Sequence, residues 1–284
     1  TSGSTGRPKG TMMTNINIGN LLNSTYKNFH QNDTDIWTLF HTYTFDFSAW
    51  EIYGCLTNGG KLIIVPRETT LNPAKMVDLI IKERVTILNQ TPAYFYKLLD
   101  EEKALNKTFT DLRLVILGGE AVFAEPVKYW KQKYPNITLY NGYGPTETTI
   151  FAFLGEITDK DVNSNEIVIG KPLYNYEISI VNKFGEPLGI GLEGELCITS
   201  KSVCSGYFNN AKMTNEKFIK TKNGMTYKSG DVGYWQKDGR IKYIGRNDHQ
   251  VKIRGFRVEL EEIEKELLNC EKVSKAVVFP VENS

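Results

Sequence analysis

The first half of the chain alternates between short apolar runs and longer stretches with apolar residues on one side. Apolar runs bounded by Gly, Pro or Asn are typical of buried strands, and apolar residues three and four apart are typical of helices. The predicted strands are 61–65, 85–88, 112–117, 137–140 and 148–153, and the predicted helices are 16–26, 48–56, 72–84, 125–134 and one that begins at Thr91-Pro92. The repeated order of strand, short loop and helix indicates a mainly parallel sheet layered with helices.

The second half of the chain has a different pattern, with short runs separated by Gly, Asn, Asp and Lys. Such runs are typical of antiparallel strands in a β-barrel-like region. They cover 177–181, 193–199, 226–228 and 240–243. Residues 245–250 then resemble a linker, and the remaining residues predict a strand at 251–254, a helix with an acidic first turn and a strand at 275–279. We therefore expect an α/β part (1–155), a β-rich part (156–246) and the start of a small α+β C-terminal subdomain (247–284).

Composition excludes several classes of protein. The 284 residues carry 34 basic and 33 acidic side chains and no polybasic run, which argues against nucleic acid as a main partner. The four cysteines are scattered without a C-x-x-C pair, so reduced thiols in a cytoplasmic protein fit better than disulfides or a zinc site. No apolar run is long enough to span a membrane. The chain starts on Thr1 without an initiator Met, which suggests a fragment.

The first ten residues, TSGSTGRPKG, combine hydroxyl groups, glycines and Lys9. Glycine lets backbone N–H groups approach an anion, and hydroxyl and ammonium groups add donors, so the stretch predicts a phosphate-binding loop. It is not a Walker A motif, because Pro8-Lys9-Gly10 stands where that motif has Gly-Lys-Ser/Thr. The alternative is a flexible linker, against which Arg7-Pro8-Lys9 argues.

Residues 141–147, NGYGPTE, form a predicted loop between two strands. The Tyr143 ring could stack on a purine, the Thr146 hydroxyl could donate to a phosphate oxygen, and the Glu147 carboxylate could hold Mg²⁺. An ordinary Gly-Pro turn with an exposed Glu is the alternative. The loop follows a strand, as do Asn89 and Gly118, and ligands of parallel sheets bind beyond the carboxyl ends of the strands.

Two further acids stand out. Asp46 lies between two phenylalanines, either as a turn residue or as a buried carboxylate that pairs with a cation. Ser48 with Glu51 matches a capping box for the helix that follows. Asp231 ends a strand after a glycine, either as an acceptor for ribose hydroxyls or as a plain β-turn residue.

Six motifs together resemble the adenylate-forming superfamily, and most closely the amino-acid adenylation domains of nonribosomal peptide synthetases. They are TSGSTGRPKG (1–10), FDFS (45–48), NGYGPTE (141–147), GELCI (194–198), YKSGD (227–231) and GRNDHQVKIRGFRVELEEIE (245–264). The resemblance implies a large N-terminal portion (1–246) with the ATP and amino-acid sites, a hinge at Asp248 and a small mobile portion. It also implies a first subdomain before Thr1 and a catalytic lysine beyond Ser284, so we expect the isolated chain to be impaired.

The resemblance also implies the role of each matching residue in binding ATP and magnesium. Thr146 would contact the α-phosphate, Glu147 would hold Mg²⁺, and Asp231 would bind the ribose. Arg246 would lie near ribose and phosphate, and Lys9, Thr146, Glu147 and Arg246 would be the catalytic residues. The residues implied for the phosphates are Thr1, Ser2, Gly3, Ser4, Thr5, Gly6 and Lys9. Those implied for adenine are Gly119, Glu120, Ala121, Asn141, Gly142 and Tyr143, and Gly144 and Tyr243 are also implied for the nucleotide.

The implied reaction is attack of an amino-acid carboxylate on the α-phosphorus of ATP, which releases pyrophosphate and forms an aminoacyl-AMP. The phosphopantetheine thiol of a peptidyl carrier domain would then take the aminoacyl group, and a condensation domain would belong to the same assembly line. No side-chain nucleophile is needed, because the main requirement is neutralisation of negative charge.

The resemblance assigns nine residues to the amino-acid pocket, where Asp46 would pair with the substrate ammonium. They are Asp46, Phe47, Trp50, Asn89, Ile116, Gly118, Gly142, Ile150 and Phe151. The first six resemble those of threonine-activating domains and the last three depart from them, so threonine or a related small amino acid is the expected substrate. An acyl- or aryl-CoA ligase and a non-catalytic nucleotide-binding remnant are the alternatives.

Overall fold

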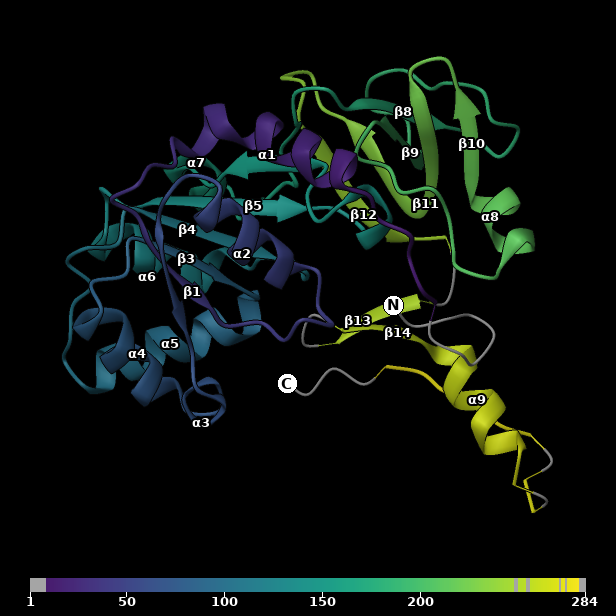
Figure 1. Ribbon diagram of the computed structural model, residues 1–284. Helices are drawn as coiled ribbons and strands as arrows, with labels where there is room; N and C mark the ends of the chain where they lie inside the picture. The colour runs from purple at the N-terminus through teal and green to yellow at the C-terminus, as the bar shows by residue number, and fades with distance from the viewer. Residues whose placement is uncertain (1–8, 248–249, 254–255, 271, 274, 281–284) are drawn as a thin grey trace.

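The computed structural model describes residues 9–247, 250–253, 256–270, 272–273 and 275–280. These residues form a large mixed sheet covered by helices, a smaller antiparallel sheet beside it, and a two-stranded unit that lies apart from both (Figure 1). The expected α/β fold with a second, β-rich part is confirmed.

The large sheet has seven strands in the order β2-β1-β3-β4-β5-β6-β7. The pairs among β1 to β5 are parallel, and β6 and β7 are added antiparallel. The strands are β1 (Ile36–Leu39), β2 (Lys61–Ile64), β3 (Ile87–Gln90), β4 (Leu114–Gly118), β5 (Thr138–Tyr143), β6 (Phe153–Glu156) and β7 (Lys171–Pro172). The mainly parallel sheet expected from the strand–loop–helix pattern is therefore present.

Helices cover both faces of this sheet. They are α1 (Asn15–Phe29), α2 (Phe47–Leu56), α3 (Arg67–Thr70), α4 (Pro73–Lys82), α5 (Pro92–Ala104), α6 (Ala124–Lys133) and α7 (Asp159–Asn163). On one face Trp50 of α2 and Leu21 of α1 pack with Ile87 and Ile116 in a core cluster that continues into the smaller sheet. Residues of α4, α5 and α6 pack with alternate residues of the same strands in a second cluster on the other face. The predicted cap at Asn72 is confirmed, since its side chain accepts a hydrogen bond from the backbone N of Lys75 at 3.1 Å.

The smaller sheet has the order β10-β11-β9-β8, with β12 pairing β11, and all of its pairs are antiparallel. Its strands are β8 (Glu177–Val181), β9 (Gly194–Ser200), β10 (Phe218–Thr221), β11 (Gly224–Trp235) and β12 (Ile241–Arg246), and α8 (Ala211–Lys217) precedes β10. Leu196 and Ile198 of β9 join the same core cluster as Trp50, so the two sheets pack together.

The C-terminal elements are β13 (Gln250–Ile253), β14 (Phe256–Glu259) and α9 (Leu260–Leu268), which extend from the two sheets (Figure 1). The expected hinge residue Asp248 lies outside the described residues. The predicted strand at 275–279 is wrong: residues 275–280 have no regular structure, and Val277 and Phe279 are exposed. Alternating apolar residues form a strand only where a neighbouring strand supplies hydrogen bonds, and none of the described strands pairs with them.

Two local predictions in the motif regions are also wrong. Asn141–Tyr143 belong to β5 rather than to a loop, and the next strand starts at Phe153 rather than at 148. Between them Thr146–Thr148 form a 3-10 turn, and positive φ angles at Thr149 and Ile150 reverse the chain. The β-branched residues that predicted a strand are thus held in a turn by tertiary packing.

The capping box at α2 is the second error. The Glu51 carboxylate accepts hydrogen bonds at 3.1 Å from the backbone N–H groups of Phe40 and His41, rather than from the start of its own helix. The Ser48 hydroxyl donates to the carbonyl oxygen of Phe45. The helix begins at Phe47, one residue before the expected cap, so Glu51 is not at the capping-box position and instead bonds the two residues that follow β1.

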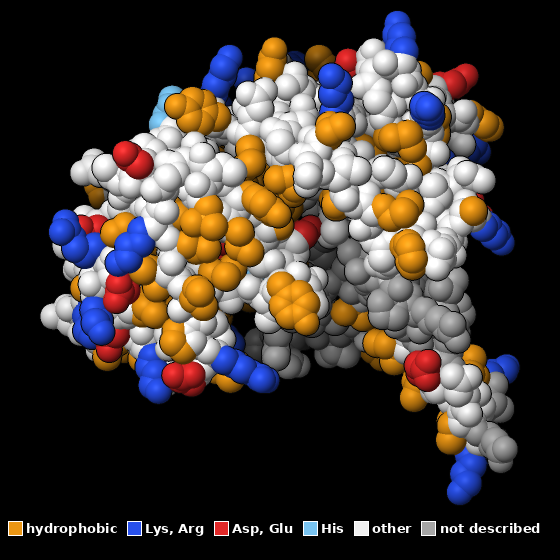
Figure 2. All heavy atoms as spheres, in the orientation of Figure 1, with side chains coloured by type: hydrophobic (Ala, Val, Ile, Leu, Met, Phe, Trp, Pro, Cys, Tyr) orange, Lys and Arg blue, Asp and Glu red, His pale blue; other side chains and the backbone are white. Residues whose placement is uncertain are grey.

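No described helix combines the length and the apolar character that crossing a membrane requires. On the face drawn in Figure 2, cationic and anionic side chains are interspersed, with hydrophobic side chains between them.

Candidate functional site

The predicted pocket residues lie where neighbouring strands of the large sheet end. Asn89 of β3 is in register with Ile116 of β4, and Gly118 of β4 is in register with Gly142 of β5. Because residues two apart on a strand share a face, Asn89, Ile116, Gly118 and Gly142 line one side of the sheet. This is the side that α2 covers, because Ile116 packs with Phe47 and Trp50 in one core cluster.

Asp46 lies directly beside the turn that carries Thr146 and Glu147. The Thr146 hydroxyl donates a hydrogen bond to Asp46 Oδ2 at 2.7 Å, although the two residues are 100 positions apart in the sequence. Asp46 precedes the first residue of α2 and is half-buried. The Asp46 carboxylate is therefore close to the turn that carries Thr146, and it is not fully exposed to solvent.

Three of the predicted pocket residues are aromatic, and their rings pack against one another. Phe151 meets Phe47 edge to face with 5.4 Å between ring centroids, and it meets Trp50 at 5.5 Å. The Trp50 indole N–H donates to Asn89 Oδ1 at 2.9 Å. An indole nitrogen only donates, so this bond fixes which end of the Asn89 amide is the oxygen. Asn89 Nδ2 is buried and has no hydrogen-bond partner among the residues that the structure describes.

The small residues on the sheet give these rings their space. A Cβ atom at Gly142 would lie 2.5 Å from Phe151 Cε1, and a Cβ at Gly118 would lie 3.2 Å from Phe47 Cζ. Ile150 reaches the same cluster from a backbone with φ of 67°, an uncommon angle for a β-branched residue. Phe151 therefore occupies volume that a side chain at position 142 would otherwise fill.

A second group joins the end of β5 to β11 and β12. The Tyr143 hydroxyl donates to Asp231, and Arg246 Nη1 contacts Asp231 Oδ1 at 2.7 Å. Burial, followed by the charge of Asp231, raises the pKa of Tyr143, so its phenol remains a donor. The Tyr243 ring lies 6.1 Å from the Tyr143 ring. The structure thus brings together four residues that the resemblance assigns to the nucleotide.

The residues assigned to adenine occupy the ends of β4 and β5. Gly119 has φ of 90°, in the region that favours glycine, and Glu120 Oε2 accepts from the backbone N of Ala93 at the start of α5. Asn141 Nδ2 donates to the carbonyl oxygen of Val168 at 3.0 Å. A Cβ at Gly144 would lie 2.5 Å from the carbonyl oxygen of Ile150, so this position requires glycine. Ala121 follows Glu120 and is exposed.

Glu147 is fully buried, which excludes the alternative of an ordinary turn with an exposed glutamate. Glu147 Oε1 accepts a hydrogen bond at 2.6 Å from the hydroxyl of Tyr207, a residue that the sequence analysis did not single out. The Lys9 ammonium lies 5.5 Å from the centre of the Tyr207 ring. Tyr207 is 60 positions from Glu147, and no local pattern marks such a contact. Of the predicted phosphate loop, Thr1, Ser2, Gly3, Ser4, Thr5 and Gly6 lie outside the described residues.

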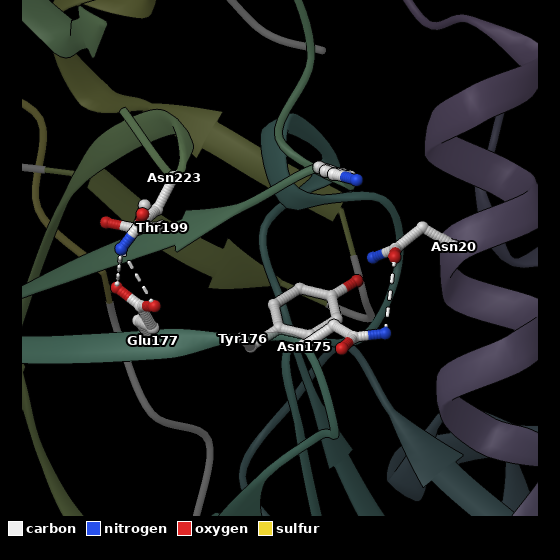
Figure 3. A pocket seen from close by; sticks show the side chains of 7 residues that line it. Asn20, Asn175, Tyr176, Glu177, Thr199 and Asn223 are labelled. Atoms are coloured by element: carbon white, nitrogen blue, oxygen red, sulfur yellow. Dashed lines mark hydrogen bonds between the residues drawn. The ribbon is translucent and has the colours of Figure 1, made fainter. Parts of the chain in front are cut away.

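A separate polar cavity of about 410 Å³ lies between α1 and the smaller sheet (Figure 3). Its lining residues are Asn20, Asn175, Tyr176, Glu177, Thr199, Lys201 and Asn223. The carboxylate of Glu177 accepts from Asn223 Nδ2 at 3.0 Å, and Asn175 Nδ2 donates to Asn20 Oδ1. None of the predicted site residues lines this cavity.

The sequence also matches known proteins. The model of the family described as AMP-binding enzyme matches residues 1–208. The dimodular nonribosomal peptide synthase of Bacillus subtilis (strain 168) is 39% identical over 291 aligned residues, a match that covers 98% of this chain and 12% of that protein. Tyrocidine synthase 1 of Brevibacillus parabrevis is 38% identical over 286 aligned residues, a match that covers 100% of this chain and 26% of that protein.

Two solved structures have the same fold at 28% sequence identity. The Vibrio cholerae adenylation domain AlmE, in complex with glycyl-adenosine-5′-phosphate, matches with a TM-score of 0.87 over 100% of this chain and 54% of its own. Holo-PA1221, a protein with adenylation and PCP domains, matches with a TM-score of 0.83 over 94% of this chain and 46% of its own. The chain thus spans about half of these structures and a smaller share of the two synthases. The chain belongs to the AMP-binding enzyme family of adenylate-forming ligases, and within it to the amino-acid adenylation domains of nonribosomal peptide synthetases.

Proposed function

We propose that this chain forms the ATP and amino-acid sites of a domain that converts an amino acid and ATP into aminoacyl-AMP and pyrophosphate. The observation that carries the proposal is the 2.7 Å hydrogen bond between Thr146 and Asp46. It sets an acceptor for a substrate ammonium next to a donor for the α-phosphate. An amino-acid carboxylate lies one carbon from its ammonium, so a substrate held by Asp46 would present its carboxylate towards Thr146.

The proposed chemistry is an in-line displacement at the α-phosphorus. The carboxylate oxygen forms the new O–P bond while the bond to the pyrophosphate oxygen breaks. The Thr146 hydroxyl has a single proton, so it would turn from Asp46 to the α-phosphate once the substrate ammonium binds Asp46. Lys9 and Arg246 would offset the charge that gathers as two anions meet. The Tyr143–Asp231–Arg246 group would receive the ribose, since each carboxylate oxygen has two lone pairs and can accept a further hydroxyl.

Glu147 suits a magnesium ion that is shared with ATP. Magnesium is commonly bound by one or two carboxylates together with substrate phosphates, rather than by a cage of protein ligands. No group of three His, Cys, Asp or Glu side chains gathers for a metal anywhere in the described part of the chain. When bound with ATP, magnesium would neutralise charge on the phosphates.

The pocket supports a compact amino acid whose side chain accepts a hydrogen bond, with threonine as our first choice. Trp50 donates to Asn89 Oδ1, so the buried Nδ2 of the amide, which has no partner among the described residues, would be the donor available to a substrate side chain. Phe151 fills the space at Gly142 and limits the length of the side chain. An aminoacyl group would pass to the phosphopantetheine of a carrier domain, and the adenylation and PCP domains of PA1221 support that partnership. A condensation domain would complete the proposed assembly line.

The test is ATP–pyrophosphate exchange by a complete adenylation domain that contains this chain. We expect exchange with amino acids and none with fatty or aryl acids, because those acids have no ammonium for Asp46. Threonine should exceed valine, which has the same shape, by roughly 5- to 150-fold, because valine leaves a buried donor unsatisfied at a cost of about 1–3 kcal/mol. Asn89→Leu should bring the ratio close to one.

Two results would count against the proposal. Exchange with fatty or aryl acids alone would favour a CoA ligase instead. Equal use of threonine and valine by the unmodified domain would leave amino-acid activation standing and remove only the claim about the side chain.

A further inference from the structure

The segment from Cys204 to Phe208 connects the two halves of the proposed ATP site. The backbone N of Cys204 donates to the carbonyl oxygen of Glu147 at 2.9 Å. Further along, the backbone N of Phe208 donates to the carbonyl oxygen of Gly10 at 2.7 Å, and Tyr207 and Thr11 form a β-bridge. One short segment is therefore bonded both to the turn that carries Glu147 and to the residues that follow Lys9.

The side chain of Tyr207 reaches the same two residues. It is only 3% exposed, and its hydroxyl donates to Glu147 Oε1 at 2.6 Å. Its ring lies under the Lys9 ammonium at 5.5 Å, within the range of a cation–π interaction. The Tyr227 hydroxyl lies 3.4 Å from that of Tyr207 and is also fully buried.

The contacts of Tyr207 fix both of its partners. Its hydroxyl is bonded to one carboxylate oxygen, so the Glu147 carboxylate is held in one orientation. The ring of the same side chain lies against the Lys9 ammonium, so one residue contacts both members of the proposed site.

We propose that Tyr207 is a positioning residue for the magnesium–ATP site, which orients the Glu147 carboxylate through its hydroxyl and supports the Lys9 ammonium on its ring. This rests on the function proposed above for Glu147 and Lys9. Residues that orient a metal-binding carboxylate commonly change metal affinity by about 10- to 100-fold when they are removed. The hydroxyl and the ring should have separable effects, because one contacts the carboxylate and the other contacts the cation.

The experiment uses a complete adenylation domain that contains this chain, with Tyr207→Phe to remove the hydroxyl and Tyr207→Leu to remove the ring as well. Binding of Mn²⁺ in the presence of ATP is measured by electron paramagnetic resonance, without the amino acid and therefore without turnover. The magnesium dependence of pyrophosphate exchange is measured in parallel. The matched control is Tyr134→Phe, which removes another buried hydroxyl that donates to a buried glutamate, Glu102, in the second core cluster.

We expect Tyr207→Phe to weaken Mn²⁺ binding and to raise the magnesium requirement by about 10-fold, with the KM for the amino acid unchanged. Tyr207→Leu should in addition raise the KM for ATP, and Tyr134→Phe should change neither. Unchanged Mn²⁺ binding in Tyr207→Phe, or an equal change in Tyr134→Phe, would overturn the proposal. If the Tyr207 variants weaken Mn²⁺ binding as expected but the unmodified domain shows no amino-acid-dependent exchange, the proposed function is overturned and the role of Tyr207 remains.

Discussion

The two layers on the large sheet each bury a glutamate that accepts a tyrosine hydroxyl, and they differ in where the partners come from. In the layer of α4, α5 and α6, Glu102 accepts from Tyr134 and Tyr129 and forms an ion pair with Lys133, all within 32 residues of sequence. In the layer that carries the site, Glu147 accepts from Tyr207, which is 60 residues away. The first arrangement ties two helices together, and the second joins distant segments around a proposed ligand. Substitutions in the first layer should therefore change stability, and those in the second should change activity.

The largest effect is expected at Asp46. Replacing Asp46 with alanine would leave the substrate ammonium without its partner, at a cost of about 2–5 kcal/mol, which lowers kcat/KM by roughly 30-fold to several thousand-fold. The measurement is amino-acid-dependent pyrophosphate exchange, with ATP binding followed separately. If ATP binding were lost to the same extent, Asp46 would be a structural residue, and the expected difference between the two layers would be wrong.

Lys133 provides the corresponding test in the other layer. Lys133→Met would leave Glu102 buried without its cation, and we expect about 2–4 kcal/mol of lost stability, since the lysine is partly exposed. Chemical denaturation measures the loss, and kcat/KM at a temperature where the variant is folded should be unchanged. A fall in kcat/KM would show that the two layers are coupled.

Gly142 tests how tightly the pocket is packed. Gly142→Ala should lower kcat/KM by an amount that corresponds to about 1–3 kcal/mol, because the new Cβ would overlap the Phe151 ring. The double variant Gly142→Ala with Phe151→Ala should recover part of this loss and accept longer side chains. Additive losses in the double variant would mean that the two positions do not share one space.

The smallest effect concerns pH and lies far from the site. Burial alone would raise the pKa of Asp35, but Arg113, the backbone N–H of Asn32 and Thr86 lower it overall. The contribution of Asp35 to stability is therefore present above its unfolded pKa of about 3.9 and is lost as pH falls through the folded value. Arg113→Met should lower the free energy of unfolding by about 1–2 kcal/mol at pH 7 and by less below pH ~4. The loss is modest because the arginine is partly exposed.

The urea midpoints of the unmodified protein and of Arg113→Met should thus converge as the pH is lowered below ~4. If they stayed equally far apart, the stabilisation by Arg113 would come from its bonds to the carbonyl oxygens of Phe29 and His30 rather than from Asp35.

Local signals predicted the helical layer well. The Asn72-Pro73 start, the strands that became β3 and β4 and the helix that became α6 depend on residues a few positions apart, and each was found within a few residues of its predicted bounds. The turn after Tyr143 was the main failure, because Thr148 to Phe153 have the composition of a strand. Packing of Phe151 against α2, together with two positive φ angles, prevails over that preference.

Short motifs and local periodicity were enough to predict most of the alternation of strands and helices, the family and the candidate residues at the strand ends. Tertiary packing was needed to bring Asp46 to Thr146, to bond Asn89 Oδ1 to Trp50 and to set Tyr207 against both Lys9 and Glu147. Contacts of this kind join residues 39 to 198 positions apart, and their existence depends on how whole elements pack. A pattern within a few residues carries no information about such packing.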